Sequence, residues 1–392
     1  MPELYDPYSH ELHDDPYPVY EQLRDSAPVY FCESRDCYVL SRFDDVWDAV
    51  HDPVTYSSAD GVFPGLTEAS PSDIVPVLIM MDPPRHTELR SLVNRAFTRR
   101  VIAEREGAIR AVAAELVAAM AERGGGDLVE DLAKPLPAIV IADLLGVPRQ
   151  DRGAFRDWSD KLVQSNPDDA GISGAAMEAG AALLGYFDTL IAERRHRPQD
   201  DLLSVLIAAE SGHHRLSREE LLGLCVLLLV AGNETTTNLV SNSALLFDRY
   251  RDEWEKVTAD RGTLGRAVEE CLRFDSPVQA LARTLTDDVE AHGVRMEKGA
   301  KVLLVYGSAN RDGREFADPD TFDVERVVDR QLAFGHGIHF CLGAPLARLE
   351  AQVAFSEILA QVRTWEVTGP ARRMHSGPIR GLLSLPVEMV AA

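Results

Sequence analysis

The sequence predicts a mainly α-helical protein with small β-sheets (α+β), built as a single domain over residues 1–392 around one long central helix. Apolar residues recur at helical spacing through most of 85–274 and again over 349–362, a pattern typical of helices with one buried face. Runs rich in β-branched and aromatic residues are short and lie within 29–40, within 278–305 and in the tail, which predicts small sheets. No repeat, low-complexity tract or linker divides the chain, so we expect one domain.

The first 80 or so residues are expected to contain a β-hairpin and two short helices. The β-rich runs 29–31 and 38–40 flank a polar turn, which predicts the hairpin. Short helices are expected over 20–25 and 44–51. Residues 52–79 are rich in Pro, Gly and Ser and show no period. A loop of this length inside a compact domain is usually functional.

Helices dominate the rest of the chain. The longest is predicted to begin at Ser217, because Ser217-Arg218-Glu219-Glu220 matches a capping box, in which the serine and the second glutamate cap each other's backbone N–H groups. The other helices are expected over 85–97, 101–123, 136–145, 155–164, 175–195, 202–210, 264–274 and 349–362. Tail strands are expected around 365–367 and 385–390. Three consecutive glycines after residue 123 end the second of the listed helices.

Composition narrows the possible partners and the compartment. The net charge of −23 argues against nucleic acid or an anionic membrane as partner, because both attract basic surfaces. The N-terminus carries no basic region followed by an apolar run, and the longest apolar stretch, 221–231, is too short to span a bilayer. We therefore expect a cytoplasmic protein with no membrane anchor.

The cysteines point to a reducing compartment, because they are odd in number, sparse and without framework spacing. They are Cys32, Cys37, Cys225, Cys271 and Cys341. A Cys32–Cys37 bond across the predicted hairpin remains an alternative.

The stretch from Phe334 to Gly343, Phe-Gly-His-Gly-Ile-His-Phe-Cys-Leu-Gly, is predicted to be a tight loop that presents the sulfur of Cys341. Its glycines permit a close turn, and the following apolar-periodic run with Pro345 predicts a helix that begins just after the cysteine. A helix N-terminus favours a thiolate over a thiol. A single thiolate without further Cys or His ligands makes a poor zinc site, but it suits the axial position of a haem iron.

This stretch resembles the haem-binding signature of the cytochrome P450 family, Phe-x-x-Gly-x-x-x-Cys-x-Gly, and the resemblance extends over essentially the whole chain. It implies the cytochrome P450 fold, with the long central helix over haem b (iron protoporphyrin IX) and Cys341 as the iron's proximal ligand. A buried structural cysteine in a Gly-rich turn is the alternative interpretation.

Within the long helix, Ala231-Gly232-Asn233-Glu234-Thr235 is an unusual sequence, since an acid and β-branched residues follow an apolar run. Considered alone, it could mark the end of the buried face, with Glu234 in solvent. It resembles the family's oxygen-activation motif, Ala/Gly-Gly-x-Asp/Glu-Thr. The resemblance implies that Ala231 leaves room for dioxygen, that Thr235 hydrogen-bonds it, and that Glu234 relays protons for O–O cleavage.

Two further sets of residues extend the resemblance. Glu270 and Arg273, at i and i+3 on one helix face, would alone suggest a surface salt bridge. They match the family's Glu-x-x-Arg motif, whose third partner would be Arg326, and this implies a buried charge network that holds the Cys341 loop. The second set would bind the haem propionates: His86, Arg90, Arg283 and His339.

The implied activity is that of a bacterial, monomeric haem-thiolate monooxygenase, which uses O₂ to hydroxylate a hydrophobic molecule of terpenoid, steroid, fatty acyl or polyketide type. The expected pocket walls are 59–79, 162–181, 228–235, 278–281 and 379–383, with Gln279 and Arg380 as polar candidates for orienting the substrate. Electrons would come from a separate ferredoxin and ferredoxin reductase, docked near Arg95, Arg99, Arg100 and Arg348. A peroxide-driven peroxygenase and a non-catalytic haem-binding or sensor protein are the alternatives, and the Glu234–Thr235 pair argues against both.

Overall fold

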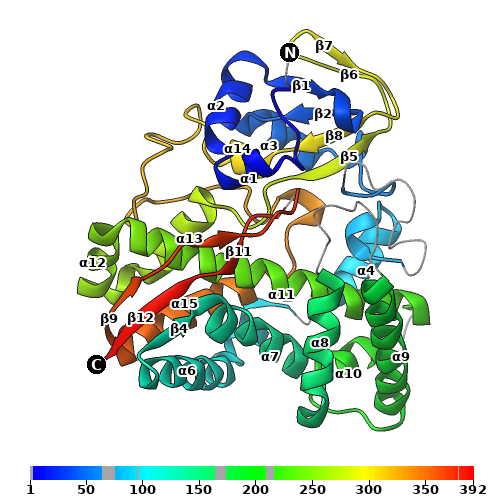
Figure 1. The fold of residues 1–392 in the computed structure, drawn as a ribbon. Helices are drawn as coiled ribbons and strands as arrows, with labels where there is room; N and C mark the ends of the chain where they lie inside the picture. The colour runs from blue at the N-terminus through cyan, green and yellow to red at the C-terminus, as the bar shows by residue number, and fades with distance from the viewer. Residues whose placement is uncertain (1–2, 64–75, 95–96, 164–173, 209–215, 378) are drawn as a thin grey trace.

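The computed structural model describes residues 3–63, 76–94, 97–163, 174–208, 216–377 and 379–392. One end of the molecule is rich in strands and contains the N-terminal elements, while the rest is mostly helical, with the C-terminal strands β9, β11 and β12 lying beside helices (Figure 1). The longest helix, α11, crosses the middle of the helical part (Figure 1). The predicted mainly α-helical fold with small sheets is therefore confirmed.

The helices are α1 His10–Asp14, α2 Tyr17–Ser26, α3 Phe43–His51, α4 Arg85–Asn94, α5 Arg99–Ala103, α6 Glu106–Glu122, α7 Pro135–Leu144, α8 Arg152–Val163, α9 Gly174–His196, α10 Leu202–Ala208, α11 Arg218–Arg249, α12 Arg251–Ala259, α13 Leu264–Phe274, α14 Tyr306–Ala309 and α15 Ala344–Gln361. The helix predicted over 101–123 is divided into α5 and α6, because the chain turns at Glu104 and Arg105. Helix α12 was not predicted.

The strands are β1 Val29–Cys32, β2 Cys37–Leu40, β3 Tyr56–Ser57, β4 Gly125–Asp127, β5 Leu281–Leu285, β6 Val289–Ala291, β7 Val294–Met296, β8 Lys301–Leu304, β9 Val362–Val367, β10 Arg372–Arg373, β11 Leu382–Ser384 and β12 Pro386–Ala391. The largest sheet has the order β1-β2-β8-β5-β3, in which only the β2–β8 pair is parallel. A second sheet, β4-β12-β9, joins the tail to the chain just after α6.

Helix α11 is the core helix of the fold. The predicted capping box is present, since Ser217 Oγ accepts from Glu220 N and the Glu220 side chain accepts from Ser217 N. Among the described residues, α11 alone is long and apolar enough to cross a membrane by length and composition, but 61% of its most apolar 18-residue window is buried inside the structure. Burial in the protein core accounts for its apolar composition.

A buried charge network lies beneath the Cys341 loop. The Glu270 carboxylate, which has no exposed surface, accepts two hydrogen bonds from Arg273, at 2.8 Å each, and one from Arg326 Nε at 3.2 Å. Arg273 also donates to the carbonyls of Asn310 and Pro319. The Asn310 side chain in turn accepts from the amide of Leu332, two residues before Phe334. The network thus links α13 to the segment that enters the loop.

We predict that Glu270→Ala destabilises the protein strongly, because it leaves the buried guanidinium of Arg273 without its carboxylate. Removing one partner of a buried pair costs about 3–5 kcal/mol. The free energy of unfolding, measured by urea titration, should fall by about that amount, and little soluble haem-loaded protein should be recovered.

The neighbouring Glu269→Ala is the matched control. Glu269 pairs with Arg348 at 2.9 Å, but both side chains are about a quarter exposed, so its loss should cost no more than about 1 kcal/mol. Equal urea midpoints for the two variants, with normal haem content, would contradict the assignment.

Candidate active site

The Cys341 loop is a tight turn seated against the end of α3. Cys341 N donates to Phe334 O at 2.9 Å, which closes the loop. Gly335 and Gly337 have φ angles of +60° and +67°, which side chains rarely permit. A Cβ on Gly337 would lie 2.2 Å from the carbonyl oxygen of Val50. Only glycine therefore lets the loop approach α3 this closely.

Some features around the sulfur of Cys341 favour the thiolate, and others favour the neutral thiol. Burial raises the pKa of the Cys341 thiol, while hydrogen bonds from the amides of Gly343 and Ala344 and the charges of Arg90 and Arg348 lower it less strongly. The amides at the start of α15 favour the thiolate, as the sequence predicted, but burial raises the pKa of the thiol by more than they lower it. A positive charge beside the sulfur, such as a metal ion, would favour the thiolate.

Helix α11 carries an accessible patch in the middle of its buried length. Ala231 is exposed and Glu234 and Thr235 are partly exposed, whereas Asn233 and Thr236 between and beside them are buried. The Thr235 hydroxyl donates to Ala231 O at 2.6 Å, and the helix continues without a break to Arg249. An accessible alanine in the middle of a core helix is what an open space for a ligand requires, and α11 packs on α15, the helix that follows Cys341.

Glu234 is held in an environment that favours its neutral form. Burial raises the pKa of Glu234 to about 7. No ion pair to Glu234 is found within the described parts of the chain. The alternative of a glutamate in free solvent therefore does not fit its surroundings, and this carboxyl can both hold and release a proton near neutral pH.

The four residues predicted to bind propionates converge beside the loop. The His86 and His339 ring centroids lie 4.4 Å apart, and Arg90 donates to the carbonyl of Phe340, next to Cys341. Burial, with Arg90 nearby, lowers the pKa of His86 to about 4. Burial lowers the pKa of His339 to about 2, with further contributions from Arg283, His86 and Arg90. Helix α4, strand β5 and the loop thus bring these donors to one place.

The described residues supply no anion to these four donors. Arg283 is 3% exposed and donates to Ala282 O, and in the described ranges no acidic side chain pairs with Arg283 or Arg90. Both ring nitrogens of His86 and Nε2 of His339 are buried without a hydrogen-bond partner. Buried cations and imidazoles are costly without partners. Two carboxylates would satisfy this set, so the residues present fit haem b, which carries two propionates.

Two polar residues expected in the substrate pocket have structural roles instead. Gln279 donates to Ser276 O and accepts from the Tyr20 hydroxyl at 3.0 Å. Arg380 is bound by Asp275 at 2.6 Å and donates to the carbonyl of His13 at the end of α1. The prediction that they orient a substrate is therefore wrong, because their hydrogen-bonding groups are engaged by other parts of the chain.

The expected pocket walls and docking patch lie only partly within the described residues. Of the expected pocket walls, residues 64–75 and 164–173 lie outside the described residues, as does Arg95 of the expected docking patch. The side chain of Arg99 is likewise not described. Arg100 is exposed and pairs loosely with Glu104 at 3.4 Å, while Arg348 is held by Glu269 and stacks over Phe334.

Sequence reasoning missed two residues that shape the site. The Tyr306 side chain lies beside the buried Arg283, and burial raises the pKa of the Tyr306 hydroxyl while the charge of Arg283 lowers it less strongly. Asp82, just before α4, accepts from the amide of Ser58 at 3.0 Å and from the Ser57 hydroxyl, and so ties the start of α4 to β3. Both contacts join segments far apart in the sequence, which local patterns do not reveal.

Known proteins resemble this chain over its whole length. The family model described as cytochrome P450 matches residues 256–386. Cytochrome P450 109 of Bacillus spizizenii is 38% identical over 392 residues, covering 97% of this chain and 94% of that protein. Vitamin D(3) 25-hydroxylase of Pseudonocardia autotrophica is 39% identical over 395 residues, covering 99% and 97%.

A solved structure shows the same similarity in three dimensions. CYP109E1 of Bacillus megaterium in complex with corticosterone has a TM-score of 0.88 at 36% identity, covering 96% of this chain and 99% of that one. Such identity over nearly the full length of several relatives shows common membership of a family. The chain belongs to the cytochrome P450 family of monooxygenases, whose members bind haem b.

Proposed function

We propose that this protein is an O₂-dependent hydroxylase of a steroid-like hydrophobic molecule, supplied with electrons by a separate ferredoxin and ferredoxin reductase. The observation that carries the proposal is the group of donors beside Cys341 that lack acidic partners among the described residues, of which His86 and Arg283 are buried and Arg90 and His339 partly buried. They match a dianionic cofactor, and the accessible patch of α11 offers space for a small ligand. When bound, haem supplies the iron that binds O₂ and carries the redox chemistry.

The cofactor would be held by residues of four elements. Cys341 would supply the single axial sulfur, and Arg90, Arg283, His86 and His339 would donate to the propionates. Burial and the nearby arginines lower the pKa of both histidines, and each imidazole can donate a hydrogen bond to a carboxylate through a ring N–H. The two arginines would supply the positive charge.

Proton supply would be the task of Glu234 and Thr235 on α11. A carboxyl with a pKa of about 7 is protonated in about half of the molecules at neutral pH, which suits a group that must donate and then be recharged. Thr235 now donates to Ala231 O. Rotation about its Cα–Cβ bond would redirect that hydroxyl toward a ligand in the space beside Ala231.

The substrate class is inferred from apolar surroundings and from the relatives. The described pocket walls contain the largely apolar segments 228–235 and 278–281. Each CH₂ group removed from water contributes about 0.8 kcal/mol, so a large apolar molecule gains most from such a pocket. One relative was solved with corticosterone, and another is named for hydroxylating vitamin D(3). We therefore favour a steroid-like substrate over fatty acyl or polyketide types.

Electron delivery requires a partner that overcomes the −23 net charge of this chain. Ferredoxins are usually acidic, so docking would use a local basic patch near the Cys341 loop. Arg100 is the described residue best suited to this, since it is exposed and only loosely paired. We propose that the enzyme is a monomer in the cytoplasm, where it would meet its ferredoxin.

The proposal is tested by optical titration of the purified ferric protein with corticosterone, vitamin D(3), a long-chain fatty acid and a macrolide. We expect a saturable shift of the Soret band to shorter wavelength for the first two. A shift for the fatty acid or macrolide alone would overturn the substrate class. Cys341→Ser should abolish the thiolate-haem spectrum, and a retained spectrum would overturn the site assignment.

The alternatives are separated by comparing product formation with O₂ and electron donors against product formation with hydrogen peroxide. A monooxygenase should form more product by the first route. More product with peroxide alone would indicate a peroxygenase, and no product by either route would favour a binding protein.

We predict that Glu234 controls how efficiently electrons are converted to product. Its protonated fraction falls as the pH rises through about 7, so product formed per electron pair should fall over the same range. Glu234→Gln should remove this inflection and slow product formation by about 10²-fold or more, the usual contribution of a positioned proton donor. Glu234→Asp, which keeps a carboxyl group, should retain much of the pH inflection and much of the rate of product formation.

The control is Glu219→Gln, an exposed glutamate in the first turn of the same helix. Its product yield and pH profile should match those of the unaltered protein. An unchanged inflection near pH 7 in Glu234→Gln would show that another group titrates.

A further inference from the structure

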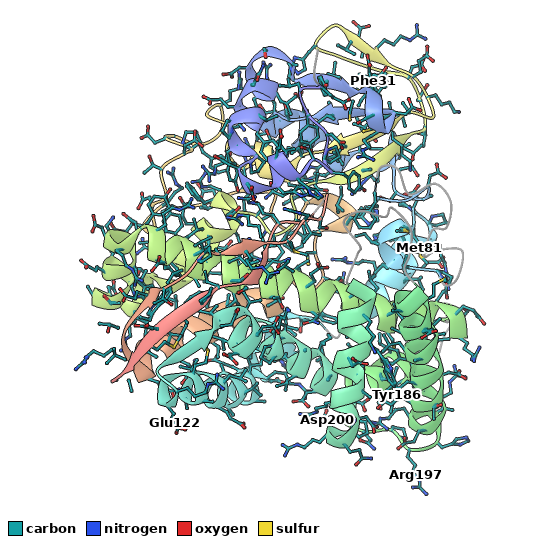
Figure 2. All side chains as sticks on the ribbon, in the orientation of Figure 1. Phe31, Met81, Glu122, Tyr186, Arg197 and Asp200 are labelled. Atoms are coloured by element: carbon teal, nitrogen blue, oxygen red, sulfur yellow. The ribbon has the colours of Figure 1, made fainter. Side chains whose placement is uncertain are left out.

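Two cysteines face each other across the hairpin at the free edge of the largest sheet. Strands β1 and β2 are antiparallel, with Cys32 directly opposite Cys37, and residues 33–36 close the turn. Phe31, which precedes Cys32, marks this hairpin at the outer end of the strand-rich part (Figure 2). Neither thiol is engaged in a disulfide.

This register matches the geometry of a disulfide. Directly opposed residues of antiparallel strands have Cα atoms about 4.5–5.5 Å apart. Disulfides usually join Cα atoms about 4.4–6.8 Å apart. The hairpin therefore need not move far for the two sulfurs to bond.

The two thiols also differ in their surroundings. The neighbouring Cys37, together with the Ser34 hydroxyl 3.5 Å from the Cys32 sulfur, lowers the pKa of the Cys32 thiol against the opposing effect of burial, whereas Cys32 and burial both raise the pKa of Cys37. Cys32 is thus the better nucleophile.

The remaining cysteines are poor competitors. Burial raises the pKa of Cys225 to about 12 and also raises the pKa values of Cys271 and Cys341. Cys341 is moreover the proposed iron ligand. Cys32 alone among the five has a pKa below its usual value.

We propose that Cys32 and Cys37 form an oxidative modification site, which closes to an intramolecular disulfide when the protein meets a low-molecular-weight disulfide such as oxidised glutathione. The Cys32 thiolate attacks one glutathione sulfur and expels a glutathione thiolate. The Cys37 sulfur then attacks the mixed disulfide at Cys32 and expels the second. Two protein thiols lose two electrons and two protons, and one glutathione disulfide becomes two glutathione thiols.

Access to the buried pair comes through the turn. Both cysteines are fully buried, but Glu33, Ser34 and Asp36 between them are exposed. Strand β1 pairs with one neighbour only, so opening the turn requires loss of the β1–β2 hydrogen bonds next to it and of the contacts of Arg35 with Asp6 and of Ser34 N with Glu3. The bond would staple the edge of the sheet in which β5 carries Arg283.

The sequence offers a direct assay, because trypsin cleaves at Arg35 between the two cysteines. Native haem-loaded protein is incubated with oxidised glutathione, free thiols are alkylated, and the protein is digested without reduction. We expect peptides 25–35 and 36–42 to appear as one linked species. It should exceed glutathione adducts at Cys225 or Cys271 by about tenfold or more, since one pKa unit changes the thiolate population about tenfold.

Single variants test the order of attack. Cys37→Ser should accumulate a glutathione adduct at Cys32, whereas Cys32→Ser should leave Cys37 largely unmodified. Cys225→Ser is the matched control and should form the linked species normally. If the linked peptides appear only after unfolding in urea, or if Cys225 is modified as fast as Cys32, the proposal is wrong.

Discussion

The buried carboxylate of Glu270 is the charge on which the Cys341 loop depends. A carboxylate without exposed surface is tolerated only when its oxygens are paired and hydrogen-bonded. Arg273 and Arg326 meet that need, and their remaining N–H groups donate to backbone carbonyls between residues 310 and 321. One carboxylate on α13 therefore sets the path of a long irregular segment, and through Asn310 and Leu332 it sets the start of the loop.

The candidate active site, by contrast, contains buried basic groups that lack partners within the described chain. The Glu270 network is satisfied within the chain, whereas both ring nitrogens of His86 and Nε2 of His339 lack hydrogen-bond partners among the described residues. A protein can keep such groups buried only if something else supplies the partners. The chain thus supplies all the partners of the charges beneath the loop, but not those of the polar groups beside it. This is the arrangement expected where a bound cofactor stabilises the folded state.

Local signals predicted the elements, and long-range contacts decided what the polar residues do. The capping box at Ser217 and the helix over 264–274 depend on neighbours in the sequence, and both are present. Gln279 and Arg380 were expected to orient a substrate, yet Tyr20 and Asp275 engage them. No periodicity reveals such partners, because they come from segments more than 100 residues away. The Cys341 loop was predictable because its glycines and cysteine are adjacent.

Helix α11 shows how the same burial that stabilises the fold also prepares the chemistry. Its apolar first half would continue as an ordinary core helix, but the accessible patch at Ala231 interrupts the packing and leaves a carboxyl one turn further on. No cation in the described chain pairs with Glu234, so its charged form is disfavoured and its pKa rises to about 7. A partner such as the arginine of Glu270 would have kept the carboxylate ionised and unable to donate. The lack of a partner therefore supports the proton-transfer role that we propose for Glu234, whereas the two arginine partners of Glu270 support a structural role for that carboxylate.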